Sequence, residues 1–163
     1  MAFRLLGNEK ATHFFSRLTA SLSNTMEYGH SGNSYSYFWD VLGAHCGGPE
    51  MAAAFLKEID WYHALTRKPD GRFVYQPLGG IYGKGLLDPI AAQVFITTMP
   101  RRALFLTGRA MGEKSLLNAE EISETIEAGK WRLADPASMS ADELIAKLDC
   151  WSPMGREWIA KHL

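Results

Sequence analysis

Apolar residues recur at intervals of three or four along most of the chain, which predicts a series of helices. The first predicted helix follows Asn8, whose side chain suits an N-cap. Its apolar stripe consists of Ala11, Phe14, Phe15, Leu18 and Leu22. The row beside this stripe contains Glu9, His13 and Arg17. We therefore expect an ordinary amphipathic helix.

The second predicted helix, residues 33–45, is apolar around most of its circumference. One stripe runs through Tyr35, Phe38, Trp39, Leu42 and Cys46, and the face beside it contains Tyr37, Val41 and Ala44. Only a narrow strip, formed by Ser36, Asp40 and Gly43, is polar or small. Because a helix of this kind is usually buried between others, we expect Trp39→Ala to cost about 3–5 kcal/mol of stability.

A third predicted helix forms a hairpin with the second. Gly47 and Gly48 end one helix, and Pro49 begins the next at a first-turn position. The inward face of the third helix is predicted to contain Met51, Ala52, Phe55, Ile59 and Tyr62. Its solvent face is predicted to contain Lys57, Glu58, Asp60 and Ala64. We therefore expect an inner helix paired with an outer, amphipathic one.

Turn and capping signals divide the rest of the chain. Residues 68–71 predict a tight turn, followed by a short β-hairpin or extended arm at residues 72–75. Asp88 and Pro89 predict the start of a fourth helix, apolar on most faces, that runs through Ile96. Later helix starts are marked by Asn118 with Glu121, by Ser140 with Glu143, and by Ser152 with Pro153. The whole pattern predicts an all-α array of helical hairpins.

Several stretches of the sequence resemble one known family. They read GHSGNSYSYFWDVLGAHCGG, IDWYHALTRKPDGRFVYQP and ALFLTG, and the match extends from about Glu9 to the end of the chain. The family consists of uncharacterised bacterial proteins that are similar to the α/α toroids of terpenoid cyclases and prenyltransferases. The closing stretch, LIAKLDCWSPMGREWIAKHL, resembles a HEAT-type repeat.

This resemblance implies a fold and no particular chemistry. It implies a partial α/α toroid over residues 1–110 and a HEAT-like helical segment over residues 111–163. Toroids of this kind are longer than this chain, so we expect a fragment or a reduced version. Helix faces that would otherwise meet missing neighbours would then be exposed, and we expect the chain to self-associate through them, to bind a partner chain, or to be poorly soluble.

Composition narrows the classes of partner. An apolar fraction of 47% and a charged fraction of 21% are typical of a globular domain. The net charge of -1 argues against a nucleic-acid binder, and no stretch approaches the roughly 18 apolar residues of a membrane span. Cys46 and Cys150 stand far apart without zinc-site spacing, so we expect no metal and no cofactor. No signal peptide is recognisable, which fits the bacterial cytoplasm or export within a longer protein.

One group of side chains has catalytic potential. His30, Asn33 and Tyr35 stand together at the start of the second helix. In some toroid-type polysaccharide lyases a His or Tyr removes a proton beside a uronate, while an Asn or Arg neutralises the carboxylate. One hypothesis is therefore a lyase or hydrolase of an acidic polysaccharide, with Arg101 or Arg102 holding the carboxylate. The same three residues also suit a tight glycine turn, a helix cap and a packed core.

The hypothesis that we prefer is a binding or scaffold module with no assignable catalytic motif. The candidate ligand-binding residues are Tyr37, Trp39, His45, His63, Tyr75 and Asp88. Asp60 precedes His63 by three residues on one helix face, a spacing that allows it to orient the imidazole. The expected partner is an apolar or sugar ligand, or another protein.

Overall fold

The computed structural model describes residues 1–23, 36–73, 90–99, 113–131 and 135–163. All regular elements within these ranges are helices, as the all-α prediction requires. The α-helices are α1 (Ala2–Leu5), α2 (Glu9–Ala20), α3 (Ser36–His45), α4 (Pro49–Thr66), α5 (Ile90–Thr98), α6 (Ala119–Gly129), α7 (Ala141–Lys147) and α8 (Pro153–Ala160). Two short 3-10 turns, η5 (Glu113–Ser115) and η7 (Pro136–Ser138), lie between them. None of these helices is both long enough and apolar enough to cross a membrane.

The predicted helix starts are confirmed wherever they fall within the described ranges. The side chain of Asn8 accepts a hydrogen bond from the Ala11 backbone N–H at 3.0 Å. Complete capping boxes begin α6 at Asn118 and α7 at Ser140, and Ser152 caps α8 ahead of Pro153. These helices therefore begin where short-range signals place them.

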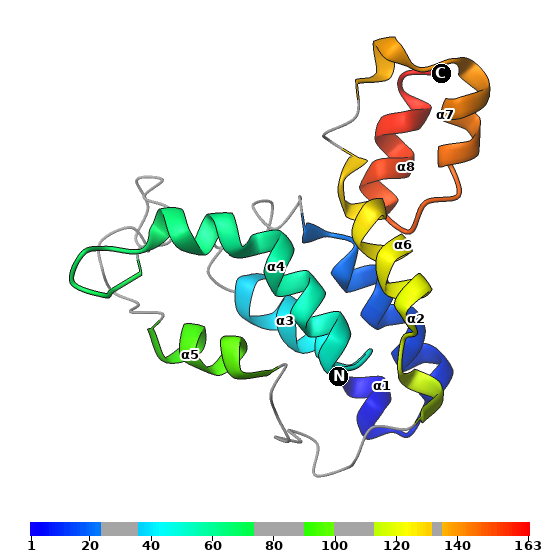
Figure 1. Ribbon diagram of the computed structural model, residues 1–163. Helices are drawn as coiled ribbons and strands as arrows, with labels where there is room; N and C mark the ends of the chain where they lie inside the picture. The colour runs from blue at the N-terminus through cyan, green and yellow to red at the C-terminus, as the bar shows by residue number, and fades with distance from the viewer. Residues whose placement is uncertain (24–35, 74–89, 100–112, 132–134) are drawn as a thin grey trace.

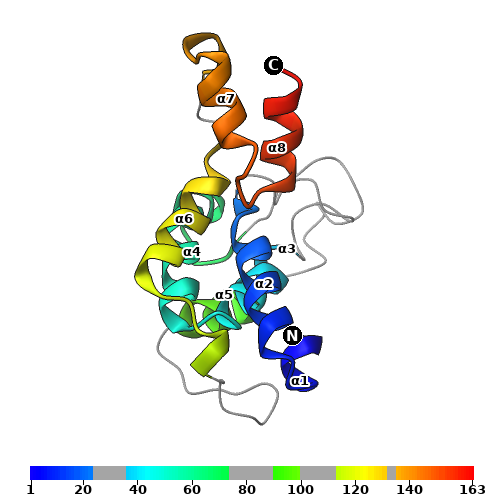
Figure 2. The same ribbon diagram turned by 90° about the vertical axis from the view of Figure 1, so that its right-hand side faces the viewer.

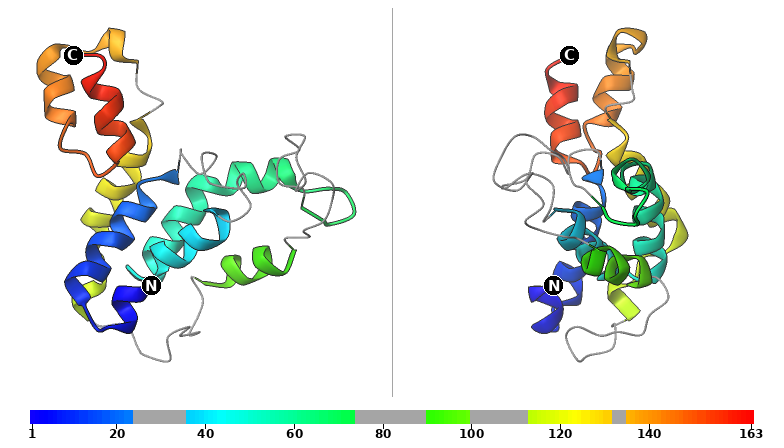
Figure 3. Two further views of the ribbon diagram at one scale, coloured as in Figure 1. Left: turned by 180° about the vertical axis from the view of Figure 1, so that it is seen from behind. Right: turned by 90° about the vertical axis from the view of Figure 1, so that its left-hand side faces the viewer.

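Helices α2, α3, α4 and α6 pack together, and the hairpin of α7 and α8 projects from them beyond the end of α6 (Figure 1). The turned views show the same projection from every side (Figures 2 and 3). Helix α5 lies against α3. The core is centred on α4, whose Met51, Phe55 and Ile59 are almost wholly buried, which confirms its predicted inward face.

The β-hairpin predicted after α4 is not seen in the part of it that the structure describes, which ends at Phe73. The turn itself is present: the Lys68 N–H donates to the Arg72 carbonyl at 2.7 Å, and Gly71 adopts a positive φ of 88°. However, α4 continues to Thr66 and leaves only Arg67 to pair with Phe73, in a single antiparallel bridge. No strand is assigned in the described ranges, because one bridge is too short to build a ladder.

The buried face of α2 is not its apolar stripe. The helix buries Thr12, Ser16, Arg17 and Ala20, which are mostly polar. Its two phenylalanines, Phe14 and Phe15, are instead 47% and 44% exposed. The aromatic part of the apolar stripe therefore lies at the surface, while the mostly polar row turns toward the other helices.

Close approach of the backbones explains this orientation. A Cβ added to Gly43 of α3 would lie 2.8 Å from Thr19 Cγ2 of α2. At Gly47, just after α3, it would lie 2.8 Å from the Ser16 hydroxyl oxygen. Helices that pack this closely need small side chains on both sides, so α2 presents its small residues and excludes its phenylalanines.

Enlarging Gly43 tests this close packing. We expect Gly43→Val to lower the free energy of unfolding by about 1–3 kcal/mol, because its branched side chain would overlap Thr19. Ala53→Val is the matched control, since Ala53 is exposed on α4. Urea unfolding of both variants provides the comparison. Equal stability of the two variants would contradict close packing at Gly43.

The second helix was predicted to be buried around most of its circumference, and this prediction is wrong for Trp39. Val41, Leu42 and Ala44 of α3 are buried as expected, but Trp39 is 54% exposed. Helix α3 packs on α2, α4 and α5, and the Trp39 side chain lies outside the core cluster that these helices form. The large stability cost first expected for Trp39→Ala therefore does not apply.

Candidate functional site

All five residues of the catalytic hypothesis fall outside the described ranges. His30, Asn33 and Tyr35 lie in residues 24–35, and Arg101 and Arg102 lie in residues 100–112. Two ligand-binding candidates, Tyr75 and Asp88, lie in residues 74–89. Tyr37 belongs to α3, but its side chain is not among those described. The proposed His/Asn/Tyr site therefore stays a prediction.

The two histidine candidates are core residues. His45 is 3% exposed at the end of α3, and His63 is 6% exposed in the last turns of α4. Burial lowers the pKa of His63, whereas the nearby charge of Asp60 acts in the opposite direction. His63 is thus held as a neutral imidazole at neutral pH. Within the described part of the chain, no group of three or more His, Cys, Asp or Glu residues is arranged to hold a metal ion.

Asp40 of α3 has the most unusual carboxyl group among the described residues. Burial raises its pKa from the ordinary 3.8 to about 7, because the charged form is poorly solvated there. Sequence reasoning placed Asp40 on a narrow polar strip and gave it no special role. A carboxyl group that is partly protonated at neutral pH is able to donate a hydrogen bond or a proton.

This shift predicts a stability that falls as the pH rises. Below pH 3.8 the Asp40 carboxyl is neutral in both folded and unfolded chains. Between pH 3.8 and about 7 the unfolded chain loses this proton first, so the free energy of unfolding decreases through that window. We expect Asp40→Asn to remove that decrease and to be more stable than the wild type above pH 7. Thermal unfolding from pH 4 to pH 8 measures it, and identical pH profiles would contradict the shift.

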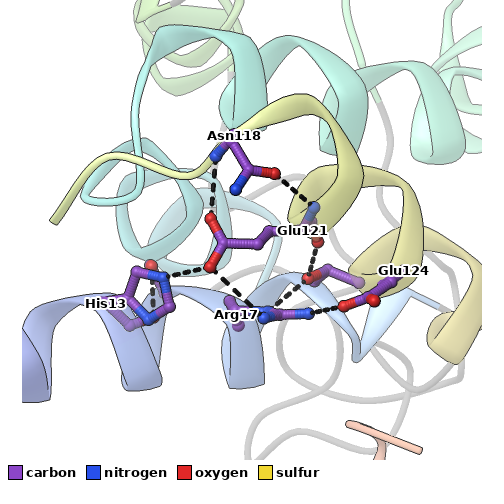
Figure 4. A network of polar contacts seen from close by, with 7 residues as sticks. His13, Arg17, Asn118, Glu121 and Glu124 are labelled. Atoms are coloured by element: carbon purple, nitrogen blue, oxygen red, sulfur yellow. Dashed lines mark hydrogen bonds and ion pairs between the residues drawn. The ribbon is translucent and has the colours of Figure 1, made fainter. Parts of the chain in front are cut away.

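A polar network joins α2 to α6 (Figure 4). The Glu121 carboxylate accepts a hydrogen bond from the Asn118 backbone N–H at 2.9 Å and lies 2.8 Å from His13 Nε2. Arg17 donates from Nη2 to the Glu124 carboxylate at 2.7 Å. Burial by itself would raise the pKa of Glu121, but the Asn118 N–H, His13 and Arg17 together hold it below its ordinary value. The network therefore favours ionised Glu121 and fixes α6 on α2.

Arg17 also connects this network to the projecting hairpin. Its Nε donates to the Thr125 hydroxyl at 3.0 Å. Its guanidinium carbon lies 4.1 Å from the ring centre of Trp151, which precedes α8, and Phe14 contacts the same ring. The helical spacing predicted that His13 and Arg17 share one row of α2. It could not predict their partners on α6, because Glu121 and Thr125 come more than 100 residues later. Their geometry indicates a structural role.

A pocket of about 310 Å³ lies between the end of α6 and the α7 and α8 hairpin. Its lining consists of Glu127, Ala128, Lys130, Trp131, Lys147, Cys150, Trp158 and Ile159. The two indole rings have centroids 5.8 Å apart and are tilted by 52° to each other. They are therefore in contact and form part of the wall, with both tryptophans only partly buried.

Gly155 of α8 positions one of these rings. A Cβ at this residue would lie 3.2 Å from Trp131 Cγ and 3.1 Å from Cys150 Sγ. Real Cβ atoms rarely come so close, so the missing side chain lets the Trp131 indole pack directly on α8. The pocket wall thus depends on a glycine in the first turn of α8.

Charged groups line the same pocket. Lys130 Nζ lies 2.7 Å from Glu127 Oε1 and 3.9 Å from Glu58 Oε1. The hydrogen bond to Glu127 is the main cause of a raised Lys130 pKa. Lys147, at the end of α7, forms no ion pair within 4 Å in the described ranges. The lining contains two lysines and one glutamate, and the Glu58 carboxylate lies beside one of these lysines.

Sequence reasoning did not identify this pocket. It gave neither Trp131 nor Trp158 a role in a site. The capping boxes before α6 and α7 could locate the helices, but no local pattern shows that the two tryptophans meet. The sequence contained one weak signal for the pocket: Trp131 and Trp158 each stand next to a charged residue in the C-terminal part of the chain.

Comparison with known proteins gives one match. A family model described as a domain of unknown function (DUF6288) matches residues 1–108. No curated protein gives a significant match, and no solved structure does. The pocket residues lie C-terminal to the matched part of the chain.

Proposed function

The chain belongs to the DUF6288 family, and we propose that it is a ligand-binding module whose site is the pocket between α6 and the α7 and α8 hairpin. The observation that carries this proposal is the pair of partly buried indoles, Trp131 and Trp158, in the wall of a pocket. Ligand sites are typically concave, lined by apolar and aromatic groups, and equipped with a few polar side chains. This pocket has each of these properties.

The finer description of the fold belongs to the same proposal. We propose an array of helical hairpins related to a partial α/α toroid over residues 1–110, with a HEAT-like segment over residues 111–163. The antiparallel pairs α3 with α4 and α7 with α8 support the hairpin array. The end of the family match at residue 108 supports the boundary. Because α6 packs on α2 and α4, the two segments share an interface.

No described residue favours the lyase or hydrolase hypothesis over the binding module. That hypothesis depends on His30, Asn33 and Tyr35, and it stays a prediction for residues 24–35.

NMR titration tests the binding site directly. The five tryptophans give five indole N–H signals, and single Trp→Phe variants assign them. The probes are a neutral disaccharide, a uronic acid disaccharide and indole acetate. We expect at least one probe to shift the signals of Trp131 and Trp158 while those of Trp39 and Trp61, exposed on α3 and α4, stay unchanged.

A matched pair of variants completes this test. Trp158→Leu is expected to abolish binding, and Trp61→Leu, which removes an exposed indole elsewhere, is expected to leave it intact. If no probe shifts Trp131 or Trp158, or if all five indole signals shift equally, the pocket is not the ligand site.

We also propose that the chain self-associates through the exposed surface of α1 and α2. The exposed apolar residues there are Met1, Phe3, Leu5, Leu6, Phe14 and Phe15. Exposed apolar surface of this kind commonly marks a contact site. Light scattering over a dilution series measures the mass, and a monomer at every concentration would contradict self-association.

A further inference from the structure

The charges around the pocket are not evenly matched. Glu127 is already bonded to Lys130, which also lies near Glu58. Lys147 is exposed, and no carboxylate of the described ranges lies within 4 Å of its ammonium group. Lys147 is therefore the pocket lysine without an ion pair within 4 Å in the described ranges, although its charge also acts on Glu143, one turn earlier on α7.

The position of Lys147 is fixed by the local backbone. It is the last residue of α7, and its carbonyl accepts a hydrogen bond from the Cys150 N–H at 3.1 Å. Cys150 in turn lines the pocket and would contact a Cβ at Gly155 of α8. The side chain of Lys147 therefore starts from a defined point on the pocket rim.

The arrangement of the indoles limits what the pocket accepts. A flat aromatic ring inserted between two parallel indoles needs centroids about 7 Å apart, twice a normal contact distance. The rings of Trp131 and Trp158 are closer, at 5.8 Å, and tilted by 52°. A ligand therefore lies across their accessible surface. The Lys147 ammonium at the edge of the lining disfavours a cationic ligand, which argues against an aromatic cage for an ammonium group.

Polar groups beside the indoles suit hydroxyls. Glu127 uses Oε1 for its contact with Lys130, and its side chain is 66% exposed. Its second carboxylate oxygen is thus accessible as an acceptor for a hydroxyl donor. The indoles would bind an apolar ring face, Glu127 would accept a hydrogen bond from a hydroxyl, and Lys147 would bind a negative charge.

On the basis of the proposed function, we propose that the ligand is an anionic saccharide: its ring lies on the indoles of Trp131 and Trp158, and its acidic group pairs with Lys147. The acidic group is a carboxylate of a uronic acid or a phosphate of a sugar phosphate, since an ammonium group binds both. Charge-assisted hydrogen bonds are about twice as strong as neutral ones, so the acidic group contributes strongly to affinity.

Calorimetric and NMR titrations with three probes test this inference. The probes are digalacturonate, the neutral digalactose of the same ring type, and glucose 6-phosphate. We expect one or both anionic probes to bind about tenfold more tightly than the neutral sugar at low salt, and to lose this advantage at high salt. The relative affinities of digalacturonate and glucose 6-phosphate identify the acidic group.

Lys147→Gln supplies the decisive variant, and Lys57→Gln, at an exposed lysine of α4, is its control. We expect Lys147→Gln to reduce anionic binding about tenfold, to leave neutral binding unchanged, and to keep the wild-type melting temperature. Unchanged anionic binding in Lys147→Gln, or a neutral sugar that binds as tightly as both anions, overturns this inference but leaves the binding module intact. Unshifted Trp131 and Trp158 signals with every probe overturn both.

Discussion

Replacing Phe55 by alanine is expected to lower the free energy of unfolding by about 3–5 kcal/mol. The Phe55 side chain is fully buried on α4 and belongs to the core cluster that α4 forms with Val41 and Leu42 of α3. Its removal takes away apolar burial and leaves a cavity, because close-packed surroundings collapse only partly. Equilibrium urea unfolding measures the loss.

Trp39→Ala is the matched control for this prediction. Both residues are large aromatics on adjacent helices, but Trp39 is 54% exposed. We expect its removal to cost less than about 1 kcal/mol, as for most surface positions. If Phe55→Ala and Trp39→Ala lower the free energy of unfolding equally, then Trp39 is covered in solution rather than exposed.

The second large effect is expected at Arg17, where alanine should cost about 2–3 kcal/mol. Its side chain is only 7% exposed and combines an ion pair with Glu124, a hydrogen bond to Thr125 and stacking on Trp151. Removing it also deletes an alkyl stem packed between helices. Thermal and urea unfolding provide the measurement.

Two further variants separate charge from packing at this position. Arg17→Met keeps most of the stem, and Glu124→Gln removes only the charge of an exposed partner. We expect both to be milder than Arg17→Ala, and the Glu124 change to be the mildest, because exposed ion pairs contribute little. Wild-type stability in both Arg17 variants would show that the network does not hold α6 on α2.

Local signals predicted the helices well. The capping boxes at Asn118 and Ser140 involve residues only three positions apart, so their hydrogen bonds are specified by the sequence itself. The inward face of α4 was also predictable, because its apolar residues follow the helical period and contact a single core. In these cases the local pattern and the tertiary packing agree.

Packing between distant segments was not predictable from local patterns. The buried face of α2 depends on Gly43 and Gly47, which admit only small side chains from a neighbour. The candidate pocket depends on Trp131 meeting Trp158 across two helix ends. Local sequence does not predict these contacts, because each contact depends on two segments that are distant in the sequence.

The projecting hairpin of α7 and α8 has a consequence for local unfolding. Of its two helices, only Leu144, Gly155 and Ile159 are buried, so it opens with a smaller free energy than α4 at the centre of the core. The pocket lies where this weakly held hairpin meets α6. A ligand that binds there would bind only the closed hairpin and would slow its amide hydrogen exchange, leaving that of α4 unchanged. Because the hairpin has low local stability, ligand binding would order residues 141–160.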